Sequence, residues 1–223
     1  MPVDKERYQG IVKEINAAGV QLVAVSKTKP VEDIKALYDL GQRDFGENYV
    51  QELSEKAARL PTDIRWHFIG HLQTNKVKYI ASFVHLIQVV DSWKLLQEID
   101  KQAAKNNRVI ECLLQVHIAK EETKFGLDEK ELDEITTRLG NSPLSNINVN
   151  GLMGMASFVE NGEVIKNEFR YLKALFEKYA ALLDSNAKTP ILSMGMSSDY
   201  KVAVEEGSNM VRIGSLIFGE RSG

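Results

Sequence analysis

The sequence is poor in the features that mark secreted, membrane-spanning or nucleic-acid-binding proteins. Its 223 residues include one cysteine, Cys112, which cannot form a disulfide within the chain, so the reducing cytoplasm is the expected location. No segment approaches the roughly 20 apolar residues that cross a bilayer, and the charged N-terminus lacks the apolar core of a secretory signal. The net charge is −3 and the basic residues are scattered, so neither nucleic acid nor a membrane is an expected partner.

Metal ligands and reactive thiols are also scarce. No cysteine and histidine residues are spaced as in a metal site. Cys112 lies within the apolar segment VIECLLQV, which favours an inert core thiol over a nucleophile. The five prolines are dispersed and no low-complexity linker interrupts the chain, so residues 1–223 are expected to form a single domain.

Eight short apolar segments alternate along the chain with longer stretches of helical periodicity. The segments are rich in Val, Ile, Leu and Phe and are bounded by Gly, Asn, Asp or Ser, as expected for strands buried on both faces. The expected strands are LVAVSK (22–27), DFGE (44–47), RWHFIG (65–70), LIQVVD (86–91), ECLLQV (111–116), INVNGLM (147–153), ILSM (191–194) and MVRIG (210–214).

The clearest amphipathic helices are predicted at 31–41, 92–105 and 163–183. Strand–helix alternation repeated about eight times implies parallel pairing through right-handed crossovers. In a chain of this length it favours a closed (β/α)₈ TIM barrel, although periodicity alone leaves an open doubly wound sheet as the alternative. In a barrel the chemistry lies at the carboxyl ends of the strands.

A serine-rich turn follows the expected strand at 191–194. Gly195 allows close backbone approach, and Ser197 and Ser198 supply hydroxyl groups and an N-cap for a helix expected to begin at Asp199. Hydroxyls and free amides at a helix start can bind a phosphate. An ordinary strand-to-helix turn with a serine cap explains the same residues.

The next expected strand ends in a similar way. Arg212 lies at its end, followed by Gly214 and Ser215, whose backbone amides can join the same site. Phosphate sites of barrels commonly form from the loops after the last two strands. The agreement between the two segments favours phosphate binding.

The first expected strand ends at a pair of lysines, Lys27 and Lys29, in LVAVSKTKP. A lysine at the end of a buried strand loses hydration, and its ammonium must find partners or give up its proton. Once a barrel closes, its first and last strands are neighbours. An amine beside a phosphate site is what pyridoxal phosphate requires.

The chain resembles the pyridoxal phosphate homeostasis proteins, which are close in fold to the N-terminal barrel of alanine racemases. The motifs that carry the resemblance span nearly the whole chain: VAVSKTKP (23–30), FGENYVQE (45–52), WHFIGHLQTNK (66–76), GLMGMA (151–156), LSMGMSSD (192–199) and VRIGSLIFG (211–219). The resemblance implies a cytoplasmic carrier that buffers free pyridoxal 5'-phosphate and supplies it to apoenzymes.

The resemblance also implies the role of each site residue. Lys27 corresponds to the Schiff-base lysine and points inward, while Lys29 is expected nearer to solvent. Arg212 faces the pyridine nitrogen and Asn48 lies beside the cofactor. The remaining cofactor contacts are the phosphate ligands Ser197, Ser198, Gly214 and Ser215.

Two residues depart from the family's pattern. His71 stands where a proline is expected, and Leu216 replaces a smaller residue. Neither is expected to touch the cofactor contacts. His67 is expected to have a structural role, and the charged segment 120–126 is expected to be a solvated loop.

Three functions remain open at this point. The first is a non-catalytic carrier without catalytic residues, and the second is a racemase of low activity. The third is a barrel enzyme that acts on a phosphorylated metabolite. Racemases of this type carry a second, β-rich domain and need proton donors on both faces of the substrate carbanion. FGERSG (218–223) follows directly on the expected last helix, so no such domain is expected; with no second donor found either, a monomeric carrier is favoured.

Overall fold

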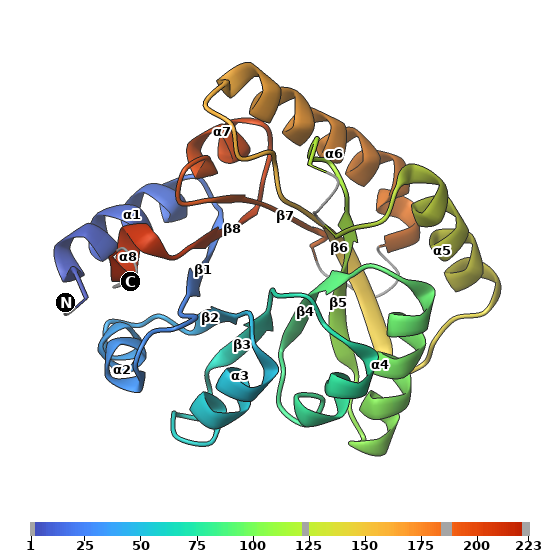
Figure 1. The fold of residues 1–223 in the computed structure, drawn as a ribbon, viewed down its shortest axis with the longest axis horizontal. Helices are drawn as coiled ribbons and strands as arrows, with labels where there is room; N and C mark the ends of the chain where they lie inside the picture. The colour runs from blue at the N-terminus through green and yellow to red at the C-terminus, as the bar shows by residue number, and fades with distance from the viewer. Residues whose placement is uncertain (1–2, 122–124, 184–188, 220–223) are drawn as a thin grey trace.

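The computed structural model describes residues 3–121, 125–183 and 189–219. Eight parallel strands close into a barrel in the order in which they occur along the chain (Figure 1). The strands are β1 (Gln21–Val25), β2 (Asp44–Glu47), β3 (Arg65–Phe68), β4 (Leu86–Val90), β5 (Ile110–Val116), β6 (Ile147–Gly154), β7 (Ile191–Met196) and β8 (Met210–Ile213). Part of the segment expected to be a charged loop, at 122–124, lies outside the described residues.

The eight strands expected from the sequence are all present, and the open-sheet alternative is wrong. Closure is shown by the pairing of β1 with β8, in which Val23 lies beside Arg212 and Ala24 beside Ile213. β1 also pairs with β2 on its other side. The chain therefore forms a TIM barrel rather than a sheet with two free edges.

Helices surround the barrel on its outside (Figure 1). They are α1 (Lys5–Ala17), α2 (Val31–Asp39), α3 (Val50–Ala57), α4 (Trp93–Lys105), α5 (Glu129–Asn141), α6 (Gly162–Leu183), α7 (Tyr200–Glu205) and α8 (Ser215–Phe218). A 3₁₀ helix, η1 (Thr74–Tyr79), lies between β3 and β4. The first and last helices, α1 and α8, are in contact, and they lie next to the seam between β1 and β8.

The packing of α4 shows how the sequence determines the outer layer. The hydroxyl oxygen of Ser92 accepts a hydrogen bond from the Leu95 amide at 3.3 Å and starts the helix. Leu95, Leu96 and Ile99 are then buried on one face at helical spacing. The strand before it, β4, is buried along its whole length, as expected for a strand covered on both faces.

Cys112 lies in β5 with its side chain fully buried. Burial raises the pKa of its thiol, so the thiolate that would be needed for nucleophilic chemistry is disfavoured. This agrees with the expectation of an inert core thiol. In the part of the chain that the structure describes, no helix is long and apolar enough to span a membrane. The described residues also contain no group of three or more metal-ligating side chains.

The buried face of α6 is expected to contribute strongly to stability. Phe169 is fully buried, whereas Tyr171 on the same helix is 41% exposed. We expect Phe169→Ala to lower the free energy of unfolding by about 3–5 kcal/mol because it leaves a cavity in the core. Urea denaturation checks this, with Tyr171→Ala as the control that should lose about 1 kcal/mol or less. Equal losses in the two variants would contradict this packing.

Candidate functional site

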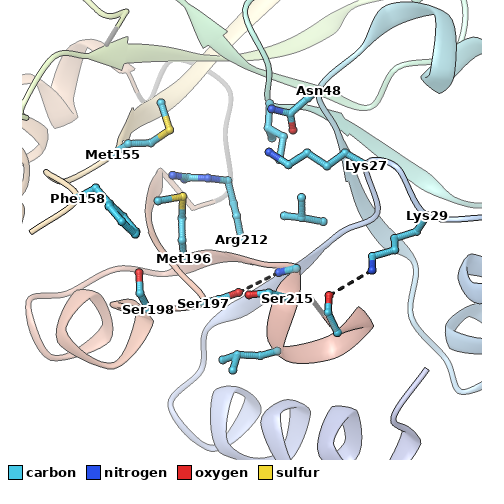
Figure 2. Close-up of a pocket in the computed structure, with 15 residues that line it drawn as sticks. Lys27, Lys29, Asn48, Met155, Phe158, Met196, Ser197, Ser198, Arg212 and Ser215 are labelled. Atoms are coloured by element: carbon cyan, nitrogen blue, oxygen red, sulfur yellow. Dashed lines mark hydrogen bonds between the residues drawn. The ribbon is translucent and has the colours of Figure 1, made fainter. Parts of the chain in front are cut away.

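A pocket of about 520 Å³ opens at the carboxyl ends of the barrel strands (Figure 2). It brings together every site residue expected from the sequence: Lys27, Asn48, Ser197, Ser198, Arg212, Gly214 and Ser215. The other residues that line it are Val25, Lys29, Ile69, Met155, Phe158, Met196, Leu216 and Gly219. The first and last strands supply most of the polar groups, because closure places their ends side by side.

Lys27 lies in a tight turn two residues beyond the end of β1. The turn is closed by a hydrogen bond from the Lys29 amide to the Ser26 carbonyl at 3.0 Å, with Thr28 at φ 62°. A positive φ at a β-branched residue is costly, so the surrounding structure must hold this turn in place. Figure 2 shows the Lys27 side chain extended into the pocket on the side of Asn48, which agrees with the inward orientation expected from the sequence.

Lys29 is held by contacts that the sequence did not indicate. It is partly buried, as Lys27 is. Its ammonium donates to the carbonyl oxygens of Phe218 and Gly219 at 3.0 and 3.2 Å. The reason is the short helix α8, whose last carbonyls lie within reach of the lysine turn. Lys29 therefore links the end of α8 to the turn that follows β1.

A buried ion cluster holds the residues on both sides of Lys27. The ammonium of Lys56 donates to the Ser26 carbonyl, to Glu47 and to Glu52, at 2.7 Å in each case. Glu52 in turn accepts the Thr28 amide at 2.6 Å. The backbone before and after Lys27 is thus tied to one lysine–carboxylate cluster, which holds the strained turn.

Glu47 is the most deeply buried member of this cluster. Its side chain is fully buried, and one carboxylate oxygen accepts from both Ser26 Oγ and Lys56 Nζ. Burial raises the pKa of Glu47, and the nearby Lys56 ammonium opposes that increase. We did not identify this cluster from the sequence. The available signal was the pair Glu52 and Lys56, four residues apart on one helix.

Arg212 is a buried cation at the pocket. Its side chain extends from β8, the residue is 3% exposed, and burial lowers its pKa to about 10. Its guanidinium donates to Ser193 Oγ at 2.6 Å and to the Gly154 carbonyl at 3.0 Å. Among the described residues, no carboxylate oxygen lies within salt-bridge distance of it. A buried positive charge held only by neutral acceptors favours an anionic or acceptor group nearby.

The loops after β7 and β8 meet at the floor of the pocket. The Gly214 amide donates to Ser197 Oγ at 3.2 Å, and this bond joins the two loops (Figure 2). A side chain at Gly214 would place its Cβ 3.2 Å from the Val25 carbonyl oxygen of β1, so a larger residue here would be crowded against the first strand. The amides of Ser198 and Ser215 donate to no described residue.

The start of α7 corrects one detail of the sequence prediction. The helix begins at Tyr200, and its N-cap is Asp199 rather than either serine. The Asp199 carboxylate turns back and accepts the Met196 amide at 2.6 Å. Both serine side chains are thereby left to line the pocket.

Asn48 follows β2 and contributes an unsatisfied acceptor. Its Oδ1 atom is buried without a hydrogen-bond partner in the described part of the chain. Gly70 lets the neighbouring loop pack against it, since a Cβ at that position would lie 2.2 Å from the Asn48 carbonyl oxygen. A buried acceptor without a partner costs free energy unless a ligand donor or water satisfies it.

The two departures from the family's pattern have different positions. His71 lies outside this pocket and stacks on Phe125 with ring centroids 4.0 Å apart. Leu216 lies in the first turn of α8 and lines the pocket beside the expected contacts, a position that the sequence did not indicate. The apolar rim residues Met155 and Met196, and Phe158 at 85% exposure, were also missed.

The pocket has the composition of an anion site. Three cationic side chains line it, Lys27, Lys29 and Arg212, and its described lining includes no acidic residue. Serine hydroxyls and loop amides lie on one side of the pocket, and an amine points into it from the other (Figure 2). This arrangement can bind a phosphate group and react with a carbonyl group on the same molecule.

Comparison with known proteins identifies the family. The model of the alanine racemase N-terminal domain matches residues 5–222. A pyridoxal phosphate homeostasis protein of Aquifex aeolicus is 44% identical over 202 residues, covering 90% of this chain and 87% of the relative. The human protein of the same name is 40% identical over 230 residues, covering 97% and 83%.

The chain belongs to the pyridoxal phosphate homeostasis protein family.

A solved structure of the family agrees in fold. The structure of PipY from Synechococcus elongatus PCC7942 with pyridoxal phosphate bound has a TM-score of 0.84 and 34% identity to this chain. The match covers 96% of this chain and 99% of PipY. The family resemblance and the TIM barrel similar to the alanine racemase N-terminal domain are therefore both confirmed.

The ion cluster beside Lys27 is expected to be essential for stability in this family member. Lys56→Met leaves Glu47 and Glu52 without their shared cation, and we expect the free energy of unfolding to fall by about 3–5 kcal/mol. The control is Lys35→Met, which removes an exposed pair with Asp39 and should have little effect. Urea denaturation measures both variants. Similar losses would show that Lys56 is not part of a compensated buried cluster.

Proposed function

We propose that this protein binds pyridoxal 5'-phosphate and acts in its intracellular homeostasis and delivery. The observation that carries the proposal is the convergence of Lys27, Arg212 and the Ser197–Gly214 loop junction on one pocket. The names of the family's members and the pyridoxal phosphate in the PipY structure support it. We also propose that residues 1–223 form a single cofactor-binding barrel domain.

The residues present fit the cofactor. Lys27 supplies an amine that would hold the aldehyde as a Schiff base, and Ser197, Ser198, Gly214 and Ser215 would hold the phosphate. Arg212 would face the pyridine nitrogen, and the unsatisfied Oδ1 atom of Asn48 offers an acceptor at the edge of the site. When bound, the cofactor supplies a reactive aldehyde and an electron-withdrawing ring.

Arg212 limits the chemistry that this site can support. Strong electron withdrawal needs a protonated pyridine nitrogen, which a carboxylate partner stabilises. A guanidinium has no acceptor atom and stays charged even with the lowered pKa of about 10. It can only donate to an unprotonated ring nitrogen. This favours retention of the cofactor over its use in carbanion chemistry, although it does not by itself distinguish a carrier from a racemase.

The pocket lining favours the carrier over the racemase. Racemisation needs an acid or base on each face of the substrate carbanion. The described lining contains no Asp, Glu, His, Tyr or Cys, and its second amine, Lys29, is bonded to the end of α8. The site thus holds one amine directed into the cavity and no partner group opposite it.

The remaining parts of the proposal concern partners and location. We infer delivery to pyridoxal-phosphate-dependent apoenzymes, a monomeric state and a cytoplasmic location. The family name supports a role in cofactor supply. The one cysteine, which is fully buried in β5, suits a reducing compartment.

Covalent trapping tests the attachment site. After incubation with pyridoxal 5'-phosphate and reduction with borohydride, peptide mass mapping should place the adduct on Lys27. Lys27→Ala should lose the adduct yet retain weaker, phosphate-mediated binding of the cofactor. Lys29→Ala is the matched control from the same turn and should keep the adduct on Lys27. An adduct on Lys29, or a wild-type protein that takes up no cofactor, would refute the assignment.

A chirality-resolved amino-acid assay tests the absence of racemisation. The loaded protein is incubated with single L-amino acids, and we expect no D-isomer above the level formed by free cofactor, because no opposing acid–base group lines the pocket. Lys27→Ala gives the background level of D-isomer that forms without a cofactor attached at residue 27. Formation of D-isomer that disappears in this variant would establish a racemase instead.

A further inference from the structure

A continuous line of buried polar side chains crosses the barrel interior from Arg212 to the opposite end. Five strands contribute one residue each, and every member is at most 5% exposed: Arg212 (β8), Ser193 (β7), Gln88 (β4), His67 (β3) and Asp44 (β2). Only Arg212 lines the pocket. The other four lie in a barrel interior that aliphatic side chains would otherwise fill.

The line is hydrogen-bonded along its whole length. Arg212 donates to Ser193 Oγ at 2.6 Å, and Ser193 Oγ donates to the side-chain oxygen Oε1 of Gln88 at 2.7 Å. The side-chain nitrogen Nε2 of Gln88 lies 2.9 Å from Nδ1 of His67. Nε2 of His67 lies 3.0 Å from Asp44 Oδ1, and Asp44 is paired with Arg65 at the far end of the barrel.

The two ends of the line fix its direction. Arg212 can only donate hydrogen bonds. At the other end, burial alone would raise the pKa of Asp44, but the hydrogen bonds from Arg65 and His67 outweigh burial and lower it below its usual range. Asp44 is therefore an ionised carboxylate that can only accept. With the side-chain amide nitrogen of Gln88 directed to His67 Nδ1 and Met210 Sδ, the line between this donor and this acceptor has one arrangement of protons.

That arrangement determines the state of each inner residue. The Gln88 side chain directs its amide nitrogen to His67 Nδ1 and Met210 Sδ, and its Oε1 atom accepts from Ser193 Oγ. In this arrangement His67 accepts from Gln88 at Nδ1 and donates from Nε2 to Asp44. The Ser193 hydrogen is thereby committed to Gln88, and a lone pair of Oγ is presented to Arg212.

The consequence for the pocket concerns the orientation of Arg212. Its guanidinium is fixed by two neutral acceptors, Ser193 Oγ and the Gly154 carbonyl. The carbonyl is part of the β6 backbone and cannot rotate, whereas the serine hydroxyl can. The bond to Gln88 gives the Ser193 hydrogen an acceptor on the side away from the cation and so holds the position of Oγ.

We propose that Gln88 and His67 are positioning residues for the cofactor, which act through Ser193 to fix the orientation in which Arg212 meets the pyridine ring. This inference rests on the proposed function, because it assigns a role to residues behind the cofactor-facing arginine. Neither Gln88 nor His67 lines the pocket. Their influence on the ring passes entirely through the hydrogen-bonded line.

The test compares Gln88→Met with a buried polar control from the loop before β8. Gln88→Met keeps a similar volume but cannot accept from Ser193 or donate to His67. The control is Ser208→Ala, which removes a buried hydroxyl that bonds to the carbonyls of Met194 and Met210, outside the line. Pyridoxal 5'-phosphate affinity is measured by absorbance titration of each full-length protein. We expect about tenfold weaker binding for Gln88→Met and unchanged binding for Ser208→Ala.

A double-variant cycle separates positioning from general destabilisation. If Gln88 acts through Arg212, then Gln88→Met combined with Arg212→Ala should bind the cofactor no more weakly than Arg212→Ala alone. Losses that multiply would overturn the proposal, as would unchanged affinity in Gln88→Met. If Gln88→Met does not fold, Ser193→Ala breaks the line with a smaller change in volume and is interpreted in the same way.

A readout on the cofactor-free protein tests the line itself. The ¹⁵N-NMR spectrum of His67 should show one tautomer, protonated at Nε2, in the wild type and in Ser208→Ala. It should show loss of that single tautomer in Gln88→Met. A wild-type His67 protonated at Nδ1 would refute the inferred direction. Failure of the wild-type protein to bind the cofactor would instead refute the proposed function, so the two failures are distinguishable.

Discussion

The pairing of β1 with β8 is the constraint on which the site depends. Val23 lies beside Arg212 and Ala24 beside Ile213. Because the strands are parallel and in this register, the turn that carries Lys27 and the loop that carries Gly214 leave the barrel at the same height. Glycine at 214 permits the approach, since a Cβ there would crowd Val25 of β1. An amine and an anion site from opposite ends of the chain thus become neighbours by closure alone.

Two buried cations at this end of the barrel, Lys56 and Arg212, have partners of opposite kinds. Lys56 is surrounded by Glu47, Glu52 and the Ser26 carbonyl, so its charge is compensated within the protein. Among the described residues, the acceptors of Arg212 are the neutral atoms Ser193 Oγ and the Gly154 carbonyl oxygen. The first cation therefore stabilises the backbone around Lys27, and the second keeps a positive potential that is directed at a ligand.

Much of the fold could be predicted from the sequence because its signals are local. Each strand is a short apolar run bounded by turn residues, and a helix such as α4 carries its own cap at Ser92. Closure could not be read from periodicity, because hydrogen bonding between the first and last strands leaves no local pattern. The convergence of the predicted residues on one pocket could be expected because their motifs lie at strand ends. Contacts made through the end of α8, at Lys29 and Leu216, were missed because they depend on where a four-residue helix points.

The interior line from Arg212 to Asp44 could not be predicted for a related reason. Gln88, His67 and Ser193 each occur in an apolar strand, where a single polar residue gives no indication of which neighbour it meets. Barrel geometry alone places them in register across the interior. The line also shows that polar side chains inside a barrel can be ordered by hydrogen bonds to one another.

The bond from Lys29 to the Phe218 carbonyl joins residues that are 189 positions apart in sequence. A chain that leaves the ribosome from its N-terminus exposes the turn with Lys27 and Lys29 early. That turn has no contact with β8 or α8 until those last elements have been synthesised. The cofactor pocket therefore does not exist on a partly synthesised chain. The site that combines the amine with the anion-binding loops therefore forms only on completion of the barrel.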